Sequence, residues 1–346
     1  MPPAIWRFPD PATEFPVIRL TDPQFTAHLP SHGVRAAGAH LLLYASDMTG
    51  KLEAYAMELR HGASRQVTDS DGLLDAGSLA LLPGDKGFCH FQADRLIETN
   101  LGSLRTREVY RVPPEYEKTP GFSLSADGAY GALVEHGQEG FRVRLVSLHT
   151  GAAKTLAEGA EEIADPLLRP HPPGLLYRQN GELRLQGFED RESRPVRLAE
   201  GANSNVLWNP DGRTLLYLNR PPDPHKLTAI REVDPETGMD AHVADTTQYI
   251  HFHPNANATV FAGASGSKAS PHVLLLLRSV NREMTLAEHH ASDASMVSPV
   301  FTPNSQEIAW VSDRHGKPAI YFMNLEKFVS ETGEATRETN PKTPHE

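Results

Sequence analysis

Short apolar strands separated by polar turns repeat along the chain. The clearest unit is LWNPDGRTLLYLN at 207–219, where an aromatic residue is followed by x-Pro, a polar turn and an apolar strand. VFTPNSQEIAWVS at 300–312 is a second copy, and weaker copies recur at intervals of roughly 41–50 residues, the spacing of four-stranded propeller blades. Helical periodicity is almost absent, and 28 prolines and 26 glycines interrupt helices throughout. The pattern predicts an all-β fold.

A second pattern fills the middle of each unit. YASDMTGKLEAYAMEL at 44–59 and WVSDRHGKPAIYFMNL at 310–325 both read as Ser-Asp, a turn, Gly-Lys and an alternating strand. The units number seven, and we place the blades at 33–68, 69–115, 116–158, 159–198, 199–245, 246–290 and 291–328. FPVIRLTD at 15–22 alternates like a strand and is placed to complete the last blade, which would leave no open sheet edge. The sequence therefore predicts a seven-bladed β-propeller with four-stranded blades, closed by an N-terminal strand.

The propeller is expected to form a single domain at 1–328. The polar segment at 329–346 reads as a disordered tail, because it has too few apolar residues to pack. The alternative fold, a set of stacked β-sandwich domains, would need a linker-like change in composition, and none divides the chain.

Composition narrows the classes of partner. The formal net charge of −11 argues against a nucleic-acid partner, which needs a basic stripe. Cys89 is the only cysteine, so no intramolecular disulfide is possible. The N-terminus lacks the basic and apolar regions of a signal peptide, and the longest apolar run, VLLLL at 273–277, is far too short to span a bilayer. We therefore predict a cytoplasmic protein with no membrane partner.

Propellers bind ligands at a mouth of the central channel, where the innermost strands begin. We register the repeats on the residue two before the turn proline, and the residue three positions earlier then lies at the entrance of each blade. In blades four to seven this residue is Asp165, Asn205, Tyr249 and Ser298. Polar or small side chains suit a ligand site, but they also suit any solvated strand end, so the pattern alone supports both interpretations.

Two histidines alternate in TTQYIHFHPN at 246–255. His251 and His253 stand at i and i+2, on one face of a strand, which allows both imidazoles to reach one metal ion. In the register above, however, they fall on Leu207 and Asn209 of blade five, away from the entrance. We therefore favour a packed His251 and a solvated His253 over a metal pair.

Several of these stretches resemble the oligogalacturonate lyases. The resemblance rests on FPVIRLTDPQFTAH (15–28), EVYRVPPEY (108–116), LWNPDG (207–212) and above all VFTPNSQEIAWVSDRHGKPAIY (300–321), and it runs from about residue 15 to 328 in the same blade order. It implies a cytoplasmic seven-bladed propeller that cleaves short pectin fragments by β-elimination, with a Mn²⁺-type ion at the channel mouth. In that reaction a cation on the uronate carboxylate stabilises the charge that develops when a base removes the C5 proton.

The positions that the resemblance assigns to the metal are substituted. The metal histidine of blade five falls on Asn205, and the Gln-x-x-His-x-His run of blade seven falls on Asp293, Met296 and Ser298. We therefore expect no metal cofactor from these positions, although Mn²⁺ remains what the resemblance implies.

In blade four, the His-Pro-x-x-x-Arg-Pro pattern of the family begins here with Asp165 and keeps Arg169. A further histidine of the family, on the next strand, falls near Gln179. The base positions of the family are therefore substituted as well.

Three functions stay open. In the first, the protein is an enzyme that acts on small anionic uronate oligosaccharides, with Arg169 gripping a carboxylate and Asp165 or His251 as the base. The expected sugar contacts are Asn205, Tyr249, Ser298 and His251. In the second, the propeller binds the same sugars without turnover, and in the third it is a TolB-like protein-interaction propeller. The sequence makes no prediction of the oligomeric state.

Overall fold

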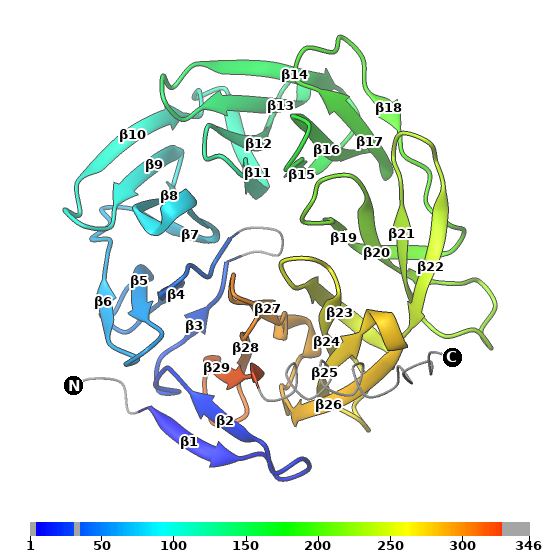
Figure 1. The fold of residues 1–346 in the computed structure, drawn as a ribbon. Helices are drawn as coiled ribbons and strands as arrows, with labels where there is room; N and C mark the ends of the chain where they lie inside the picture. The colour runs from blue at the N-terminus through cyan, green and yellow to red at the C-terminus, as the bar shows by residue number, and fades with distance from the viewer. Residues whose placement is uncertain (1–4, 31–34, 327–346) are drawn as a thin grey trace, which may run out of the picture.

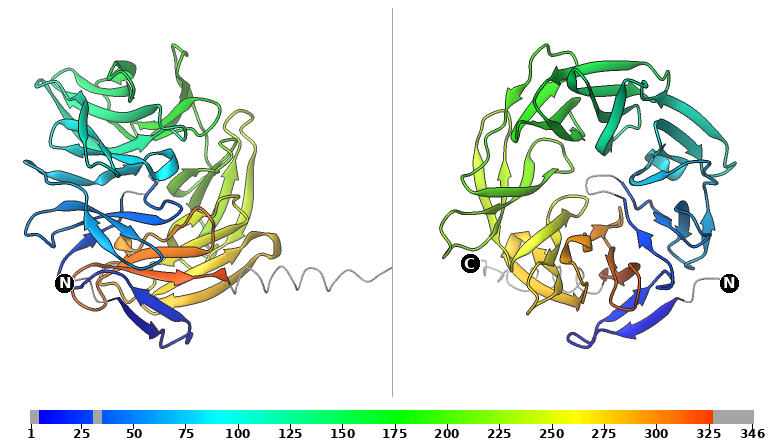
Figure 2. Two further views of the ribbon diagram at one scale, coloured as in Figure 1. Left: turned by 60° about the vertical axis from the view of Figure 1, so that its left-hand side comes forward. Right: turned by 180° about the vertical axis from the view of Figure 1, so that it is seen from behind.

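Seven antiparallel sheets surround a central axis in the computed structural model, which describes residues 5–30 and 35–326 (Figures 1 and 2). Six sheets have four strands and the seventh has five. In each sheet the strands follow chain order outward from the axis, except that the last sheet combines both ends of the chain. The predicted seven-bladed propeller is therefore confirmed. The tail predicted at 329–346 lies outside the described residues.

The blades have the following strands. Blade one contains β3 (Ala27–His28), β4 (Leu41–Ser46), β5 (Glu53–Glu58) and β6 (Ser64–Gln66), and blade two contains β7 (Leu74–Leu81), β8 (Gly87–Gln92), β9 (Arg95–Asn100) and β10 (Thr106–Arg111). Blade three contains β11 (Tyr116–Leu124), β12 (Tyr130–Gly137), β13 (Gly140–Ser147) and β14 (Ala153–Gly159), and blade four contains β15 (Ile163–Leu168), β16 (Gly174–Gln179), β17 (Glu182–Gly187) and β18 (Arg194–Pro195).

Blade five contains β19 (Ala202–Trp208), β20 (Leu215–Arg220), β21 (Ala229–Val233) and β22 (Asp240–Asp245), and blade six contains β23 (Tyr249–Pro254), β24 (Val260–Ser265), β25 (His272–Leu277) and β26 (Arg282–Glu288). Blade seven contains β27 (Val300–Phe301), β28 (Glu307–Ser312), β29 (Ala319–Asn324), β2 (Pro16–Arg19) and β1 (Trp6–Pro9). Three short 3₁₀ turns, η1 (Pro83–Asp85), η2 (Arg278–Val280) and η3 (Ala294–Met296), complete the list.

The ring closes through strand pairing between the two ends of the chain. In β2, Ile18 pairs with Phe322 and Arg19 pairs with Tyr321 of β29, so β2 is the fourth strand of blade seven, as the alternation at 15–22 predicts. β1 then pairs with β2 and adds a fifth strand, which the sequence analysis did not anticipate. Blade one also begins earlier than the predicted residue 33, because its innermost strand β3 is Ala27–His28.

The core lies between neighbouring blades rather than inside any one of them. In one cluster Val17 of β2 packs with Trp310 and Tyr321 of blade seven and with Leu275 of blade six. The other clusters likewise join residues of adjacent blades. Each blade is therefore held in place by its two neighbours. This packing also fixes where the strands end at the two mouths of the channel. No helix in the described residues is long and apolar enough to cross a membrane.

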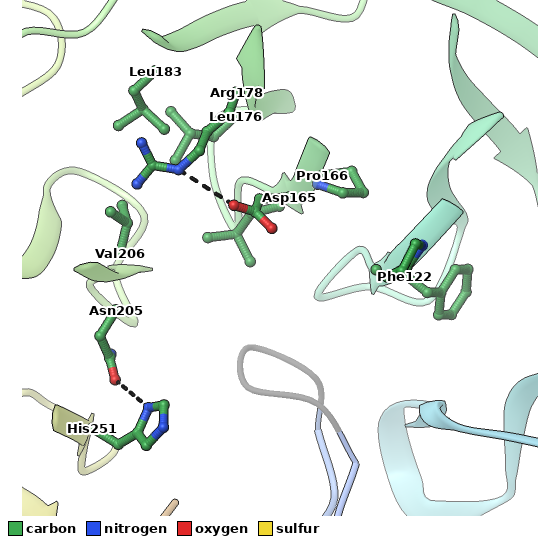
Figure 3. Close-up of a pocket in the computed structure, with 12 residues that line it drawn as sticks. Phe122, Asp165, Pro166, Leu176, Arg178, Leu183, Asn205, Val206 and His251 are labelled. Carbon is green, nitrogen blue, oxygen red and sulfur yellow. Dashed lines mark hydrogen bonds and ion pairs between the residues drawn. The ribbon is translucent and has the colours of Figure 1, made fainter. Parts of the chain in front are cut away.

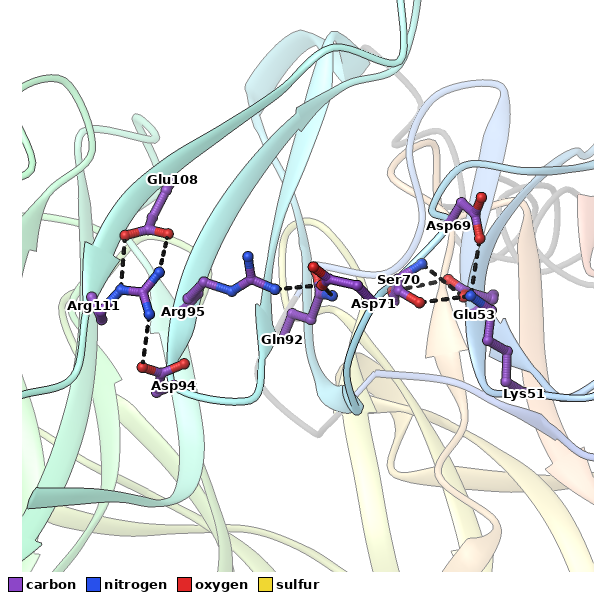
Figure 4. A network of polar contacts seen from close by, with 10 residues as sticks. All are labelled: Lys51, Glu53, Asp69, Ser70, Asp71, Gln92, Asp94, Arg95, Glu108 and Arg111. Atoms are coloured by element: carbon purple, nitrogen blue, oxygen red, sulfur yellow. Dashed lines mark hydrogen bonds and ion pairs between the residues drawn. The ribbon is translucent and has the colours of Figure 1, made fainter. Parts of the chain in front are cut away.

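Polar networks tie the loops of blades one and two to their sheets (Figure 4). The carboxylate of Glu53, on β5, is buried and accepts hydrogen bonds from the Ser70 backbone and from Thr68, with Lys51 Nζ 3.1 Å away. Burial raises the pKa of a carboxyl group, but these donors outweigh it and the pKa of Glu53 is lowered. Glu53 is therefore a structural anion, already satisfied by its own surroundings.

Shortening Val17 should weaken the ring closure. Val17 is fully buried in the cluster that joins blades six and seven, so Val17→Ala should lower the free energy of unfolding by about 1.5–3 kcal/mol. Val280, whose exposed fraction is 57%, offers a matched control: Val280→Ala should change it by less than about 0.5 kcal/mol. Equal effects of the two substitutions in denaturant unfolding would contradict the role of β2 in the core.

His90 should make stability depend on pH. It is buried between blades one and two, and burial lowers its pKa from 6.5 to about 4. Between these values the unfolded chain binds the proton and the folded chain does not, so stability is lost as the pH falls from 6.5 towards 4, by up to about 3 kcal/mol. His90→Leu should remove this component from the unfolding free energies measured at the two pH values, whereas replacing the exposed His149 should not. A pH dependence unchanged in His90→Leu would show that His90 is not the group concerned.

Candidate functional site

One backbone hydrogen bond gives blades three to seven the same reference point. After each innermost strand of blades three to seven, the N–H of one residue donates to the carbonyl of the fifth residue on, and the donors are Ser125, Arg169, Asn209, Asn255 and Thr302. Counting back four residues from each donor reaches one residue in each blade, inside the innermost strand in blades three to six and just before it in blade seven. These residues are Gly121, Asp165, Asn205, His251 and Ser298. They form the entrance set of the mouth at which these strands begin.

This register corrects the prediction for blade six. Pro170, Pro210 and Pro303 each follow the reference donor, whereas Pro254 precedes Asn255. Anchoring on the proline therefore displaced blade six by two residues and put Tyr249 where His251 belongs.

Tyr249 lies in the core between blades five and six, and its exposed fraction is 2%. Its ring fills the space above Gly263, where a Cβ atom would come within 2.1 Å of it. Tyr249 is therefore not at the mouth.

β-bulges set the direction of two entrance side chains. The pairing of β15 with β16 shifts between Ala164 and Leu167, and that of β19 with β20 shifts between Ser204 and Leu207. Asp165 and Asn205 sit in these bulges with φ of 53° and 52°, in the left-handed region that Asp and Asn tolerate better than other non-glycine residues. A bulge re-aims a side chain, and here it takes both residues out of the alternation of their strands.

A cavity of about 410 Å³ opens at this mouth, and we call it the first cavity (Figure 3). Its wall comes from blades three to six and includes Gly121, Phe122, Asp165, Arg178, Asn205 and His251. Its size is within the range of small-ligand sites, and its mostly apolar lining carries the polar side chains of Asp165, Arg178, Asn205 and His251. The structure thus brings together three predicted residues, Asp165, Asn205 and His251.

Arg178 is the cation of the first cavity, and the sequence analysis missed it. Arg178 lies on β16, and its Nε is 3.3 Å from Asp165 Oδ2 (Figure 3). The exposed fractions of the Arg178 and Asp165 side chains are 26% and 72%. Nη1 donates to Gly181 O at 3.3 Å, and within the described residues Nη2 has no hydrogen-bond partner. The guanidinium therefore keeps donors for an anionic ligand.

Asn205 and His251 form the second pair on the wall (Figure 3). Asn205 bridges blades five and six, because its Oδ1 accepts from Phe252 N at 3.0 Å and its Nδ2 donates to Phe252 O at 3.1 Å. These bonds identify Oδ1 as the atom that faces His251 Nδ1, 3.3 Å away. His251 Nε2 lies 3.1 Å from Ser295 O. Both ring nitrogens therefore face oxygen acceptors.

The pKa of His251 is lowered below its usual value. Burial lowers it, and this outweighs the Ser295 carbonyl and the carboxylate of Asp293, which raise it. His251 is therefore neutral at pH 7 and donates through one nitrogen at a time.

Arg169, the predicted carboxylate grip, lies elsewhere. It follows β15, at the end of the strand away from Asp165, and the exposed fraction of its side chain is 6%. Its Nε donates to Gly212 O and its Nη1 donates to Glu236 Oε1, both at 2.7 Å, while the guanidinium covers the Trp208 ring. Arg169 therefore joins blades four and five, and the structure does not bring it to the first cavity.

The remaining predicted residues, His253 and Ser298, lie away from the wall of the first cavity. His253 lines a different cavity, near Trp208 and Phe301, and its Nδ1 contacts Pro254 O at 2.9 Å. His251 and His253 line different cavities. Ser298 is half-buried and precedes β27, at its predicted place in the entrance set.

Comparisons with known proteins agree with the propeller and with the resemblance. No family model matches the chain. It is 22% identical to an oligogalacturonide lyase of Pectobacterium atrosepticum, over 92% of this chain and 95% of that protein. Its fold matches the structure of an oligogalacturonate lyase in complex with manganese with a TM-score of 0.89 and 22% identity, covering 95% of this chain and 98% of the other. A protein described as TolB from Agrobacterium tumefaciens gives 0.50 and 14% identity, over 78% and 96%.

The class defined by fold and mouth is thus a seven-bladed propeller with a cavity that carries a few polar side chains where its innermost strands begin. Within that class, the chain resembles the oligogalacturonate lyases in sequence and fold over nearly its whole length, as the sequence analysis predicted.

The residues that the structure describes at this mouth do not fit a manganese ion. Such ions take several oxygen or nitrogen donors, and within residues 5–30 and 35–326 no group of three or more His, Cys, Asp or Glu side chains is placed to hold one. Asp165 already pairs with Arg178. Two unit charges about 4 Å apart at an effective dielectric constant of about 20 interact by about 4 kcal/mol, so a divalent ion would meet about twice that in repulsion from the guanidinium.

Replacing Asn205 by aspartate should raise the pKa of His251. The new carboxylate would stand beside Nδ1 and favour the imidazolium, and an NMR titration of the ring would show the shift upward. Asn257→Asp is the matched control. It adds the same charge in the turn beyond the other end of β23, far from the ring, and should leave the pKa of His251 unchanged. If Asn205→Asp also leaves it unchanged, the contact between residues 205 and 251 is absent in solution.

Proposed function

We propose that the protein takes short uronate oligosaccharides into the first cavity and cleaves them by β-elimination. The observation that supports this most directly is the Asp165–Arg178 pair on the cavity wall of a chain that resembles oligogalacturonide lyases over 92% of its length. The substrate would be a small anionic oligosaccharide. A cytoplasmic location and the absence of a nucleic-acid partner stay predictions from the sequence.

Arg178 would bind the uronate carboxylate. A guanidinium recognises a carboxylate through two parallel N–H donors, and Nη2 together with Nη1 offers such a pair once Nη1 leaves Gly181 O. The same contact strengthens when the C5 proton is removed, because negative charge then spreads onto the carboxylate oxygens. Arg178 thus takes the role that the sequence analysis gave to Arg169.

Asp165 would be the base. The C5 carbon carries both the proton and the carboxylate, so a base beside the carboxylate clamp lies close to the proton it must take. Asp165 is held there by its contact with Arg178 Nε and by the bulge in β15. The C5 electrons form the new double bond to C4, and the C4 oxygen leaves with the rest of the chain.

His251 and Asn205 would position the sugar rather than take its proton. Both nitrogens of His251 are directed at oxygen atoms, and Asn205 is fixed by the backbone of Phe252. Sugar hydroxyls both donate and accept hydrogen bonds, so a sugar at the edge of the cavity would exchange for part of these contacts. Ser298, from blade seven, completes the proposed contacts; Tyr249 is left out, because it is buried.

Binding without turnover is a second candidate, and one observation favours it. Asp165 is engaged by Arg178, and a carboxylate held by a guanidinium must give up part of that contact before it can reach a substrate proton. A propeller with this site would hold the sugar and leave it intact. The TolB-like alternative draws less support, because the structural likeness is far greater to the lyase than to TolB.

Replacing Arg178 tests the site. Arg178→Ala should weaken the binding of digalacturonate at least roughly tenfold in calorimetry, because it removes a charged pair of hydrogen bonds. Arg213→Ala, in the exposed turn at the other end of the propeller, is the matched control and should bind as the unchanged protein does. Equal loss in both variants, or in neither, would remove Arg178 from the proposal.

Asp165→Asn separates the two candidates. If the protein is a lyase, the ultraviolet absorbance of the unsaturated product should rise with the unchanged protein and not with the variant, while binding persists in both. No absorbance with either protein, together with binding heat, would select the binding function. The heat should also survive a chelator, because the donor set does not fit a metal; its loss on chelation would contradict that assignment.

A further inference from the structure

A cavity of about 840 Å³ lies between blades one and two, and we call it the side cavity. It shares no lining residue with the first cavity. One wall is a face of β8 and β9, where the strand register sets the pair His90 and Ile97 beside the pair Gln92 and Arg95. The facing wall is the connection from β6 to β7 at 67–71. The proposed function gives this cavity no role.

One end of the side cavity is acidic (Figure 4). Lys51 Nζ lies 2.9 Å from Asp69 Oδ1 and 3.1 Å from Glu53 Oε1. Arg95 Nη2 donates to Asp71 Oδ1 at 2.5 Å, so three carboxylates face two cations. The side chains of Asp69 and Asp71 are 90% and 78% exposed, and within the described residues their Oδ2 atoms accept from no other residue. This end therefore has free acceptors and excess negative charge, which suit an ammonium group.

His90 lies further along the same face and is unpartnered. Its exposed fraction is 2%, and within residues 5–30 and 35–326 neither ring nitrogen has a hydrogen-bond partner. Nδ1 is fully covered, so a proton there would be a buried donor without an acceptor, and the neutral ring therefore carries its proton on Nε2. Because His90 lines the side cavity, this N–H is left for an acceptor on a ligand, such as a carbonyl oxygen.

An exposed leucine in an unfavourable conformation lies at the apolar end of the side cavity. Leu104, in the turn after β9, has a φ of 55° and an exposed fraction of 43%. Glycine would adopt this left-handed backbone without strain, and a polar side chain would suit the exposure better. Val67 and Ile97 line the cavity with it. A strained apolar side chain at a cavity rim is what contact with an apolar group of a ligand would explain.

We propose that the side cavity binds the amino-terminal end of a short peptide. The terminal ammonium group meets the free oxygens of Asp69 and Asp71, and a backbone carbonyl accepts from His90 Nε2. An apolar side chain packs on Ile97 and Leu104. Each group that the walls leave without a partner then has one, and such capture of a peptide amine is a recurring mode of recognition. A uronate would instead bring its carboxylate against Asp69 and Asp71, so this site takes a different class of ligand from the first cavity.

Calorimetry with leucyl-leucinamide and its N-acetyl derivative tests the site, because the two differ only at the amino end. The unchanged protein should bind the free amine at least about tenfold more tightly, since acetylation removes the charge. Asp71→Asn should weaken the free amine about threefold and leave the acetylated form unaffected. Asp211→Asn, in the exposed turn after β19, is the matched control and should bind both probes as the unchanged protein does.

Two further measurements place the peptide in the cavity. Leu104→Gly should weaken both probes about threefold while the melting temperature stays the same or rises, because glycine relieves the left-handed backbone. The ring nitrogen signals of His90 in NMR should move when leucyl-leucinamide binds, and those of the exposed His149 should not.

Four outcomes would overturn the inference. They are equal affinity for the two probes, full affinity for the free amine in Asp71→Asn, binding that leaves the His90 signals unmoved, and no binding of either probe. Butylamine that binds as tightly as leucyl-leucinamide would also overturn it, because the site would then take a simple amine and make no use of the carbonyl and side chains of a peptide.

Discussion

The pairing of β2 with β29 is the constraint on which the rest of the molecule depends. Two residues near the N-terminus, Ile18 and Arg19, pair with a sheet whose three inner strands lie almost three hundred residues further along the chain. Because the core lies between blades, each blade needs a neighbour on both sides, and only a closed ring provides this for all seven. Closure of the ring also creates the site. The innermost strands surround one axis, so the entrance residues of blades three to six meet around the first cavity.

Most of the fold could be read from the sequence, and the failures have local causes. The repeat of turn and strand gives seven blades because each blade must bury two apolar faces. β1 escaped prediction because WRFP is short and lies beyond the strand that closes the ring. Blade six was misregistered because its proline stands on the other side of the turn donor. A turn can be built with proline before or after that donor, so the position of the proline does not define the register.

The site was harder to predict than the fold. Asp165 and Asn205 carry a sequence signal, since each stands five residues before a turn proline, and His251 stands in the alternating histidine pair. Arg178 is on the second strand of its blade, and its proximity to Asp165 arises from a bulge in the neighbouring strand. Arg169 looked like the better candidate because it stands in a family-like pattern, yet its guanidinium is used between blades. A signal for Arg178 existed in the pairing of β15 with β16, which puts it opposite the residue before Asp165.

The left-handed backbone at Asp165 and Asn205 has a consequence for how the mouth evolves. Blade three has glycine at the same place, Gly121, where the conformation is free of side-chain strain. Drift towards glycine in blades four and five would ease the backbone and at the same time erase the polar groups of the cavity. Keeping a side chain at Asp165 and Asn205 therefore costs stability relative to glycine. If descendants of this chain retain both side chains, that retention would indicate selection for the site.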